Sequence, residues 1–413
     1  MNTFTSIFII MLTLATVIQL WLINRQYKRV STHRGEVPTP FNDKIPLEAH
    51  QKAADYTIAK IRVERIDLVY SAVILLGWTL GGGLDLLDTV WRNLELSPVV
   101  TGIGVLLSVF FISNILDLPF SVYHTFGLEQ RFGFNHATPA IFIKDLLLQT
   151  AIAFIIGLPL AWIVLWLMEQ SGQLWWIYVW AVWMGFSIFM MWAYPAVISP
   201  LFNKFSPLDD GGLKTRIETL LTRTGFKSNG IFVMDGSRRS GHGNAYFTGL
   251  GTNKRIVFFD TLIKSLTPGE IEAVLAHELG HFKRRHIHKR IGSMAALSLI
   301  ALALLGWLIN QNWFYTGLGV HHPSDYVALI LFMFALPVFS FLVSPLMLYI
   351  TRRHEFEADD YAAKQADPKE LIQALVKLYK ENAATLTPDP LYSAFHDSHP
   401  PAPIRVAHLG TKL

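Results

Sequence analysis

The pentapeptide HELGH at positions 277–281 is the part of the sequence best suited to chemistry. On a helix, His277 and His281 are four positions apart, so both imidazole rings project from one face and can share a metal ion. Glu278 lies beside them, within reach of a water molecule at that ion. HExxH on a helix is the zinc-peptidase arrangement, with the histidines as ligands and the glutamate as general base.

The residues before this motif predict the helix that the motif requires. Thr267 is suited to the N-cap, Pro268 to the first helical position, and Glu270 completes a capping box with Thr267. The competing interpretation is a solvated helix that carries two surface histidines and binds nothing. The capping signals, together with the helical spacing of the apolar residues Ile271, Val274, Leu275 and Leu279, favour the catalytic helix.

A third metal ligand is needed, because a catalytic zinc usually has three protein ligands and one open position. The best candidate is Glu355, in the segment EFEADDYA that directly follows the last long apolar stretch. Asp359 lies one helical turn further on and is placed to accept the second N–H of a ligand histidine. The neighbouring acids Glu357 and Asp360 point elsewhere on a helix and are interpreted as solvated.

The composition is that of a polytopic membrane protein. Of the 413 residues, 52% are hydrophobic and 16% are charged, whereas soluble domains carry about 25% charged residues. Because there is no cysteine, the chain has no disulfide framework, no thiolate metal site and no cysteine nucleophile. The net charge of +4 is small. We expect a lipid bilayer and a peptide or protein substrate as partners, and no nucleic acid.

Seven stretches are long and apolar enough to cross a bilayer, which takes about 20 helical residues. They are Phe4–Ile23, Ile66–Leu87, Val99–Val122, Leu146–Met168, Leu174–Ile198, Gly292–Ile309 and Tyr326–Ile350. A seven-helix path places 34 of the 35 Lys and Arg residues on one side and only Arg92 on the other. The positive-inside bias assigns the crowded side to the cytoplasm, with the N-terminus outside and the first stretch as an uncleaved anchor. His286 and His288 then belong to a basic collar at the cytoplasmic surface.

These spans divide the chain into four parts. Residues 1–198 form an N-terminal membrane region with five helices, and residues 292–350 supply helices six and seven. Soluble chemistry is confined to two cytoplasmic segments, 199–291 with HELGH and 351–413 with Glu355. Because both segments leave the membrane at the same side, the topology alone brings Glu355 and the two histidines to one membrane face. We predict a predominantly α, seven-helix membrane protein.

Longer blocks of the sequence resemble the integral-membrane zinc metalloproteases known as CAAX prenyl protease type I. The resemblance runs over most of the chain and rests on the blocks HTFGLEQRFGFNHATP (124–139), YPAVISPLFNKFSPL (194–208), NAYFTGLGTNKRIVFFDTL (244–262), HELGH, RRHEFEADDYA (352–362) and SHPPAPIR (398–405). Smaller stress-response membrane proteases share HELGH and the ExxxD pattern, but they are shorter and lack the first two blocks.

The resemblance implies seven long helices around a water-filled intramembrane chamber, capped by a zincin-like α+β catalytic domain on the cytoplasmic side. It also implies that His277, His281 and Glu355 bind one zinc ion per chain and that Glu278 is the catalytic glutamate. Asp359 accepts the second ring N–H of a ligand histidine and so fixes its tautomer.

Four further residues take their roles from the same resemblance. Asn244 with Ala245 is similar to the edge-strand element that pairs with the substrate backbone in antiparallel fashion. His399 and Arg405 match the family's His and Arg near the site. His399 is the candidate donor to the developing oxyanion, and Arg405 either assists it or binds a substrate carboxylate. The alternative for these two residues is a cap and a salt bridge in the C-terminal tail.

Members of this family remove the last three residues of C-terminal C-a-a-X proteins after prenylation, and they are not strictly tied to prenylated substrates. The resemblance therefore implies a zinc endopeptidase. Two alternatives stay open: a quality-control protease of membrane proteins that uses the same site, and a non-enzymatic chamber or transporter, which has no need for Glu278. The absence of cysteine and of a dilysine retrieval signal favours a bacterial inner membrane over the endoplasmic reticulum. No feature indicates the oligomeric state.

Overall fold

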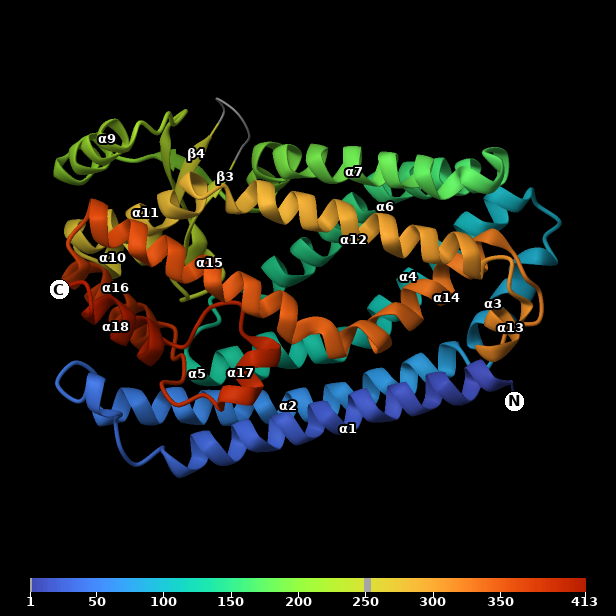
Figure 1. Ribbon diagram of the computed structural model, residues 1–413, viewed down its shortest axis with the longest axis horizontal. Helices are drawn as coiled ribbons and strands as arrows, with labels where there is room; N and C mark the ends of the chain where they lie inside the picture. The colour runs from blue at the N-terminus through green and yellow to red at the C-terminus, as the bar shows by residue number, and fades with distance from the viewer. Residues whose placement is uncertain (1, 249–253) are drawn as a thin grey trace.

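The structure is a computed structural model that describes residues 2–248 and 254–413 (Figure 1). Long helices run side by side between two ends of the molecule, with the N-terminus at one end and the C-terminus at the other. Positions 249–253 of the 244–262 block lie outside the described residues.

Six helical stretches of the described chain are long and apolar enough to cross a membrane, and a bent pair supplies a seventh. The six are built from α1 (Thr3–Thr32), α4 (Pro98–Val122) with the π-helix η2 (Tyr123–Glu129) and α5 (Gln130–Phe132), α6 (Pro139–Gln170), η3 (Gly172–Leu174) with α7 (Trp175–Ala193), the π-helix η4 (Tyr194–Ile198) and α8 (Ser199–Phe202), α12 (His286–Leu308), and α14 (Asp325–Ser340) with η6 (Phe341–Val343) and α15 (Ser344–Gln365). Only 11% of the apolar windows of α6 and α12 is buried. These helices therefore present most of their surface to lipid or to the space between helices.

The bent pair lies where the sequence predicts one continuous span over Ile66–Leu87. Instead, α2 (Leu47–Trp78) and α3 (Gly83–Arg92) meet at an angle of 44°. The break follows from the glycines between them, because Gly82 adopts the left-handed backbone at φ +76°. A Cβ at Gly81 would lie 2.9 Å from the carbonyl oxygen of Gly77. Small residues therefore allow the chain to fold back on itself at this point.

A small mixed sheet stands at the C-terminal end of the bundle. Its strand order is β1 (Phe205–Pro207), β2 (Ile231–Met234), β4 (Arg255–Phe259) and β3 (Ala245–Thr248). Strands β2 and β4 are parallel, and the other two pairs are antiparallel. Because β3 is the last strand in this order, it forms an edge of the sheet. The remaining helices are η1 (Thr39–Phe41), α9 (Gly212–Thr224), η5 (Gly236–Arg238), α10 (Asp260–Ser265), α11 (Pro268–Lys283), α13 (Asn312–Gly317), α16 (Pro368–Glu381), α17 (Pro390–His396) and α18 (Ala402–Gly410).

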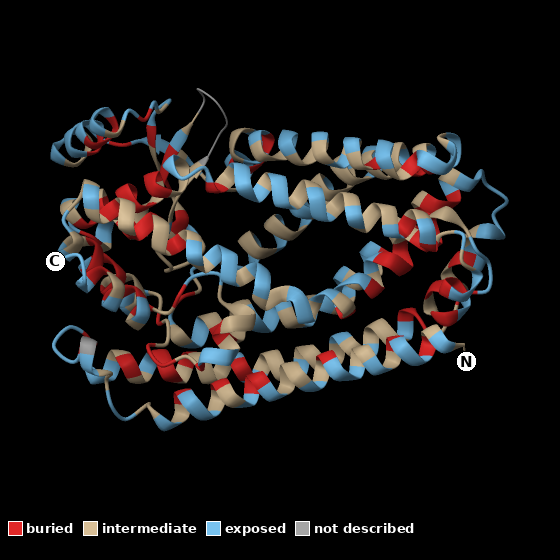
Figure 2. Ribbon diagram, in the orientation of Figure 1, coloured by how far each residue is buried: buried red, intermediate tan, exposed pale blue. Residues whose placement is uncertain are grey.

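Buried residues gather at the two ends of the molecule, whereas the long helices between them are mostly half-buried or exposed (Figure 2). At the end that carries the sheet, a hydrophobic core includes Ile217, Phe258, Leu275, Leu371 and Leu409. This core packs α11 against α9, α15 and α16. At the other end, a second core joins the starts of α1 and α14 to α3 and α4. The first core is the one that positions the HELGH helix.

Candidate metal centre and active site

The helix that carries HELGH begins with the capping box that its sequence predicts. The Glu270 amide donates to Thr267 Oγ1 at 3.3 Å, and the Thr267 amide donates to Glu270 Oε2 at 2.7 Å. The buried Glu270 carboxylate also receives Lys377 Nζ at 2.7 Å. These bonds satisfy the free amides at the start of α11 and tie it to α16, which fixes the direction in which His277 and His281 project.

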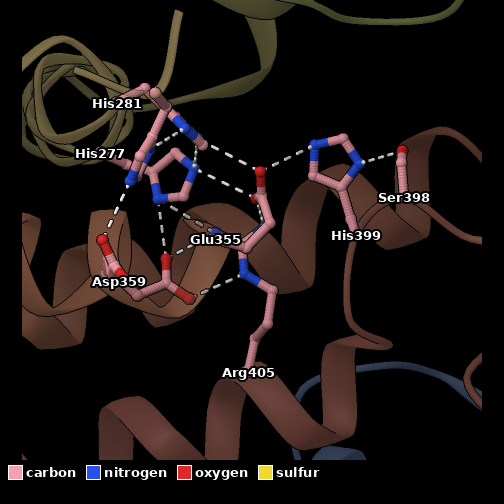
Figure 3. A network of polar contacts seen from close by, with 9 residues as sticks. His277, His281, Glu355, Asp359, Ser398, His399 and Arg405 are labelled. Carbon is pink, nitrogen blue, oxygen red and sulfur yellow. Dashed lines mark hydrogen bonds and ion pairs between the residues drawn. The ribbon is translucent and has the colours of Figure 1, made fainter. Parts of the chain in front are cut away.

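Close packing of α15 against α11 brings the third candidate ligand to the histidines. A Cβ at Gly280 would lie 2.9 Å from Ala358 Cα, so only glycine allows the two backbones to approach this closely. Ala358 is fully buried at this contact. Glu355 lies one turn before it on α15 and therefore reaches the histidine face of α11 (Figure 3).

Two imidazole nitrogens and one carboxylate converge between these helices. Glu355 Oε1 lies 3.2 Å from His281 Nε2, and Glu355 Oε2 lies 3.4 Å from His277 Nε2. The two Nε2 atoms are 3.3 Å apart. Glu355 Oε2 is buried without a hydrogen bond, although His277 is near it. All three ligand atoms lie within 4.8 Å of one another, so the residues present fit a metal with nitrogen and oxygen ligands.

Behind the ligands, Asp359 and Arg405 hold His277 in place. His277 Nδ1 lies 2.8 Å from Asp359 Oδ1, and Arg405 makes a two-pronged contact with the same carboxylate at 2.6 and 2.9 Å. Burial and the Arg405 charge lower the pKa of His277, but the adjacent Asp359 and Glu355 carboxylates outweigh these two effects and raise it to about 9. The buried Arg405 guanidinium also lies 3.7 Å from Glu355 Oε2, so it pairs with two carboxylates of this chain, and the geometry favours a positioning role over binding of a substrate carboxylate.

Glu278 follows His277 on α11, and His399 approaches Glu355 from the C-terminal segment. Glu278 is half-exposed and forms no hydrogen bond or ion pair with any described residue, so its carboxylate is available. His399 is exposed, with Nε2 3.5 Å from Glu355 Oε1 and Nδ1 3.1 Å from Ser398 Oγ. In Figure 3 its ring lies across Glu355 from the two histidines of α11. Both residues are at least partly accessible to solvent.

Asn244 and Ala245 lie at the start of the edge strand β3. Ala245 pairs with Phe258 of β4, and the Phe259 amide donates to the Asn244 carbonyl at 2.9 Å. This pattern leaves the Ala245 N–H and C=O pointing away from β4. The Ala245 amide is covered only by the exposed side chain of its neighbour, Asn244 Oδ1, at 2.8 Å.

Two residues interpreted from sequence as peripheral lie next to the ligands. His286 is buried, with Nδ1 3.0 Å from His281 Nδ1 and Nε2 3.1 Å from Glu357 Oε2. The basic-collar interpretation is therefore wrong for His286, and Glu357 is not a free solvated acid. Arg285, at φ +57°, turns the chain back between α11 and α12 and brings His286 under His281. Neither the 281–286 spacing nor any other local pattern signals that turn.

Fold and site together define a membrane-embedded metallopeptidase. A family model described as CAAX prenyl protease N-terminal, five membrane helices, matches residues 26–204, and a model described as Peptidase family M48 matches residues 207–412. The chain therefore belongs to peptidase family M48 and, within it, to the CAAX prenyl proteases. The resemblance read from the sequence blocks is confirmed, and the non-enzymatic alternative has no support.

Individual relatives match over nearly their whole length. The chain is 36% identical to the CAAX prenyl protease 1 homolog of Arabidopsis thaliana, over 86% of each chain. It is 34% identical to CAAX prenyl protease 1 of Saccharomyces cerevisiae, over 92% of this chain and 89% of the relative. The crystal structure of S. mikatae Ste24p superimposes with a TM-score of 0.93 at 32% identity, covering 99% of both chains. The predicted helical membrane fold with a chamber and a small sheet is thereby confirmed.

Proposed function

We propose that this metallopeptidase is a zinc endopeptidase whose metal is held by His277, His281 and Glu355. The observation that supports this most is the convergence of their ligand atoms, together with the unbonded Glu355 Oε2. Two imidazoles and one carboxylate are a donor set of catalytic zinc sites. Calcium and magnesium prefer all-oxygen ligands, so this donor set favours zinc over them.

The chain's own residues divide the work of peptide hydrolysis. When bound, zinc supplies Lewis acidity toward the scissile carbonyl and lowers the pKa of water. Glu278 takes a proton from the attacking water and returns it to the leaving amine. His399 donates a hydrogen bond to the oxygen on which negative charge develops. Asp359, held by Arg405, keeps the His277 ring in the orientation that presents Nε2 to the metal.

The substrate binds by strand addition at β3. An extended peptide pairs in antiparallel fashion with the outward-facing N–H and C=O of Ala245, and the Asn244 side chain moves off that amide to contact the peptide. The relatives are named CAAX prenyl proteases. We assign the same substrate class to this chain: a peptide or protein that ends in C-a-a-X and is prenylated on its cysteine.

We further propose that the catalytic end lies at the cytoplasmic face of the membrane and that this membrane is a bacterial inner membrane. The one-sided distribution of Lys and Arg supports the orientation. Because the natural chain has no cysteine, single introduced cysteines report sidedness without background. Thr411→Cys should be protected from an impermeant thiol reagent in intact cells, and Asn93→Cys should react. The reverse pattern would contradict the orientation.

The proposed function is tested with full-length protein in detergent. We expect one zinc per chain by elemental analysis, and cleavage of a farnesylated C-a-a-X peptide that a chelator abolishes and added zinc restores. The farnesylated peptide should have the higher kcat/KM over its unmodified counterpart. Equal values would favour the quality-control alternative, and absence of zinc would overturn the proposal.

One pair of variants separates metal binding from catalysis. Glu278→Gln should keep zinc and lose cleavage by about 10²–10⁴-fold, the usual contribution of a general base. Glu272→Gln is the matched control, because Glu272 lies on the same helix but pairs with Arg216 at 2.8 Å. It should keep both zinc and activity. Retained cleavage by Glu278→Gln would contradict the mechanism.

A further inference from the structure

The direction of a peptide on β3 follows from the register of the sheet. This step rests on the proposed function, in which substrate pairs in antiparallel fashion with Ala245. A strand antiparallel to β3 has its carboxyl end at the beginning of β3, because β3 runs from Ala245 to Thr248. The part of the substrate beyond the cut is therefore directed toward residues 240–244.

The free edge of the sheet is closed in that direction. The Gly243 amide donates to Asn382 Oδ1 at 3.0 Å, and Asn382 Nδ2 lies 3.4 Å from the Gly243 carbonyl. Just before it, Ser240 forms a bridge with Asn135, and the Gly241 amide donates to the Phe134 carbonyl at 3.0 Å. An added strand cannot continue pairing past Asn382, so it must end there or leave the sheet.

A cavity of about 450 Å³ lies at this closed end. Its wall toward β3 is His242, which is held on three sides. Its Nε2 lies 3.2 Å from Glu129 Oε2, its Nδ1 lies 3.3 Å from Asn382 Oδ1, and its ring stacks on Phe134 at 4.3 Å. Glu129 belongs to η2, and π-helical turns of this kind are frequent at functional sites.

The charged groups that line the cavity are paired with one another, and Lys60 is the exception among the described residues. Arg239 is bound to Asp145 at 2.7 and 2.9 Å. The Lys60 ammonium lies 5.1 Å from the Tyr56 ring centre and forms no ion pair with any described residue. His124 is exposed, and its Nε2 faces the Glu129 carboxylate, with 3.8 Å to Oε1. Lys60 and His124 can therefore donate to an anionic group that enters the cavity.

We propose that this cavity binds the free C-terminal carboxylate of the substrate, through Lys60 and His124. The enzyme would thus select peptides whose chain ends a short distance beyond the scissile bond. Asn382 and the 134–136 segment stop the strand, and His242 is a positioning residue between strand and cavity. The substrate carboxylate supplies the negative partner that Lys60 does not have among the described residues.

The proposal is tested with the zinc-loaded full-length protein and two farnesylated peptides of identical sequence, one ending in a carboxylate and one in a carboxamide. The carboxylate peptide should have a kcat/KM about tenfold higher or more, the size of one charge-assisted hydrogen bond, with most of the difference in KM. Equal kcat/KM values for both peptides would overturn the carboxylate site alone. Failure to cleave either peptide would contradict the proposed function itself.

Two lysines of α2 provide a matched pair of variants. Lys60→Met should reduce the carboxylate-to-carboxamide ratio of kcat/KM toward one. Lys52→Met is the control, because the Lys52 ammonium also lies over an aromatic ring, that of Phe134 at 5.0 Å, but does not line the cavity. It should leave the ratio unchanged. An unchanged ratio in Lys60→Met, or the same fall in both variants, would contradict the role of Lys60.

Discussion

Two buried acids at opposite ends of the molecule differ in how their oxygens are used. Asp88 of α3 is fully buried, and each of its oxygens has a donor: Arg92 Nε at 2.7 Å and the Tyr326 hydroxyl at 2.7 Å. Glu355 of α15 is also buried, but its Oε2 accepts no hydrogen bond and lies 3.4 Å from His277 Nε2 and 3.7 Å from Arg405 Nη1. Figure 1 places α3 and α15 far apart, so the two networks are independent.

The difference separates a structural network from a binding site. A buried polar group left without a partner costs free energy, so a complete network such as that of Asp88 stabilises the fold and needs nothing else. At Glu355 two imidazole nitrogens and a carboxylate converge instead, and these are atoms that a metal ion binds. The two ends therefore differ in the chemistry of their buried acids: Asp88 has a donor on each oxygen, whereas Glu355 belongs to a set of metal-binding atoms.

The largest expected effect is a loss of metal binding and of cleavage when Glu355 is substituted. Glu355→Gln keeps the shape of the side chain but removes its charge, so metal binding should be lost. Because a bound metal contributes several kcal/mol of transition-state stabilisation, cleavage should fall by at least about 10³-fold. Elemental analysis and the peptide assay check both results. Full metal content in Glu355→Gln would show that the cluster is not the metal site.

The next effect concerns the support behind the ligands. Arg405→Met removes the two hydrogen bonds that the guanidinium makes to the buried Asp359 carboxylate, and breaking such a buried pair costs about 3–5 kcal/mol. We expect a clear fall in the thermal unfolding midpoint of the metal-free protein. Arg353→Met is the control, because the Arg353–Glu357 pair is exposed at 3.8 Å and contributes less than about 1 kcal/mol. Equal shifts in both variants would deny Arg405 its positioning role.

A smaller effect is expected at the other end. Tyr326→Phe removes the donor to Asp88 Oδ1 and leaves that oxygen unsatisfied, at a cost of about 1–3 kcal/mol. Metal content and the kcat/KM of the folded fraction should not change, since the network lies far from the ligands. A loss of metal in Tyr326→Phe would show that the two ends are coupled and would end the contrast.

Sequence patterns predicted the cluster of His277, His281 and Glu355, but they did not predict the Asp88 network. The cap at Thr267 and the helical spacing of HELGH depend on residues close in sequence, and Glu355 was reachable because the membrane topology returns both segments to one face. The Tyr326–Asp88 bond joins residues 238 positions apart. It depends on the bend between α2 and α3, which helical periodicity does not encode. The position of His286 was not predicted for a similar reason, because the left-handed backbone of the single residue Arg285 redirects the chain.

The smallest expected effect is a change of metal affinity with pH, caused by the proton on His277. In the metal-free protein, the protonated His277 ring stabilises the fold fully below the ordinary histidine pKa of about 6.5, and this stabilisation is lost as pH rises through about 9. A metal must displace that proton. Between pH 7 and 8.5, the metal affinity should therefore rise about tenfold per pH unit from this proton alone, as measured by competition with a chelator of known affinity. In Asp359→Asn the acidic partner is lost, so the rise should level off at lower pH. A profile that is flat from pH 7 to 8.5 in the unaltered protein would mean that His277 is already neutral there, and that Asp359 orients the ring without storing a proton on it.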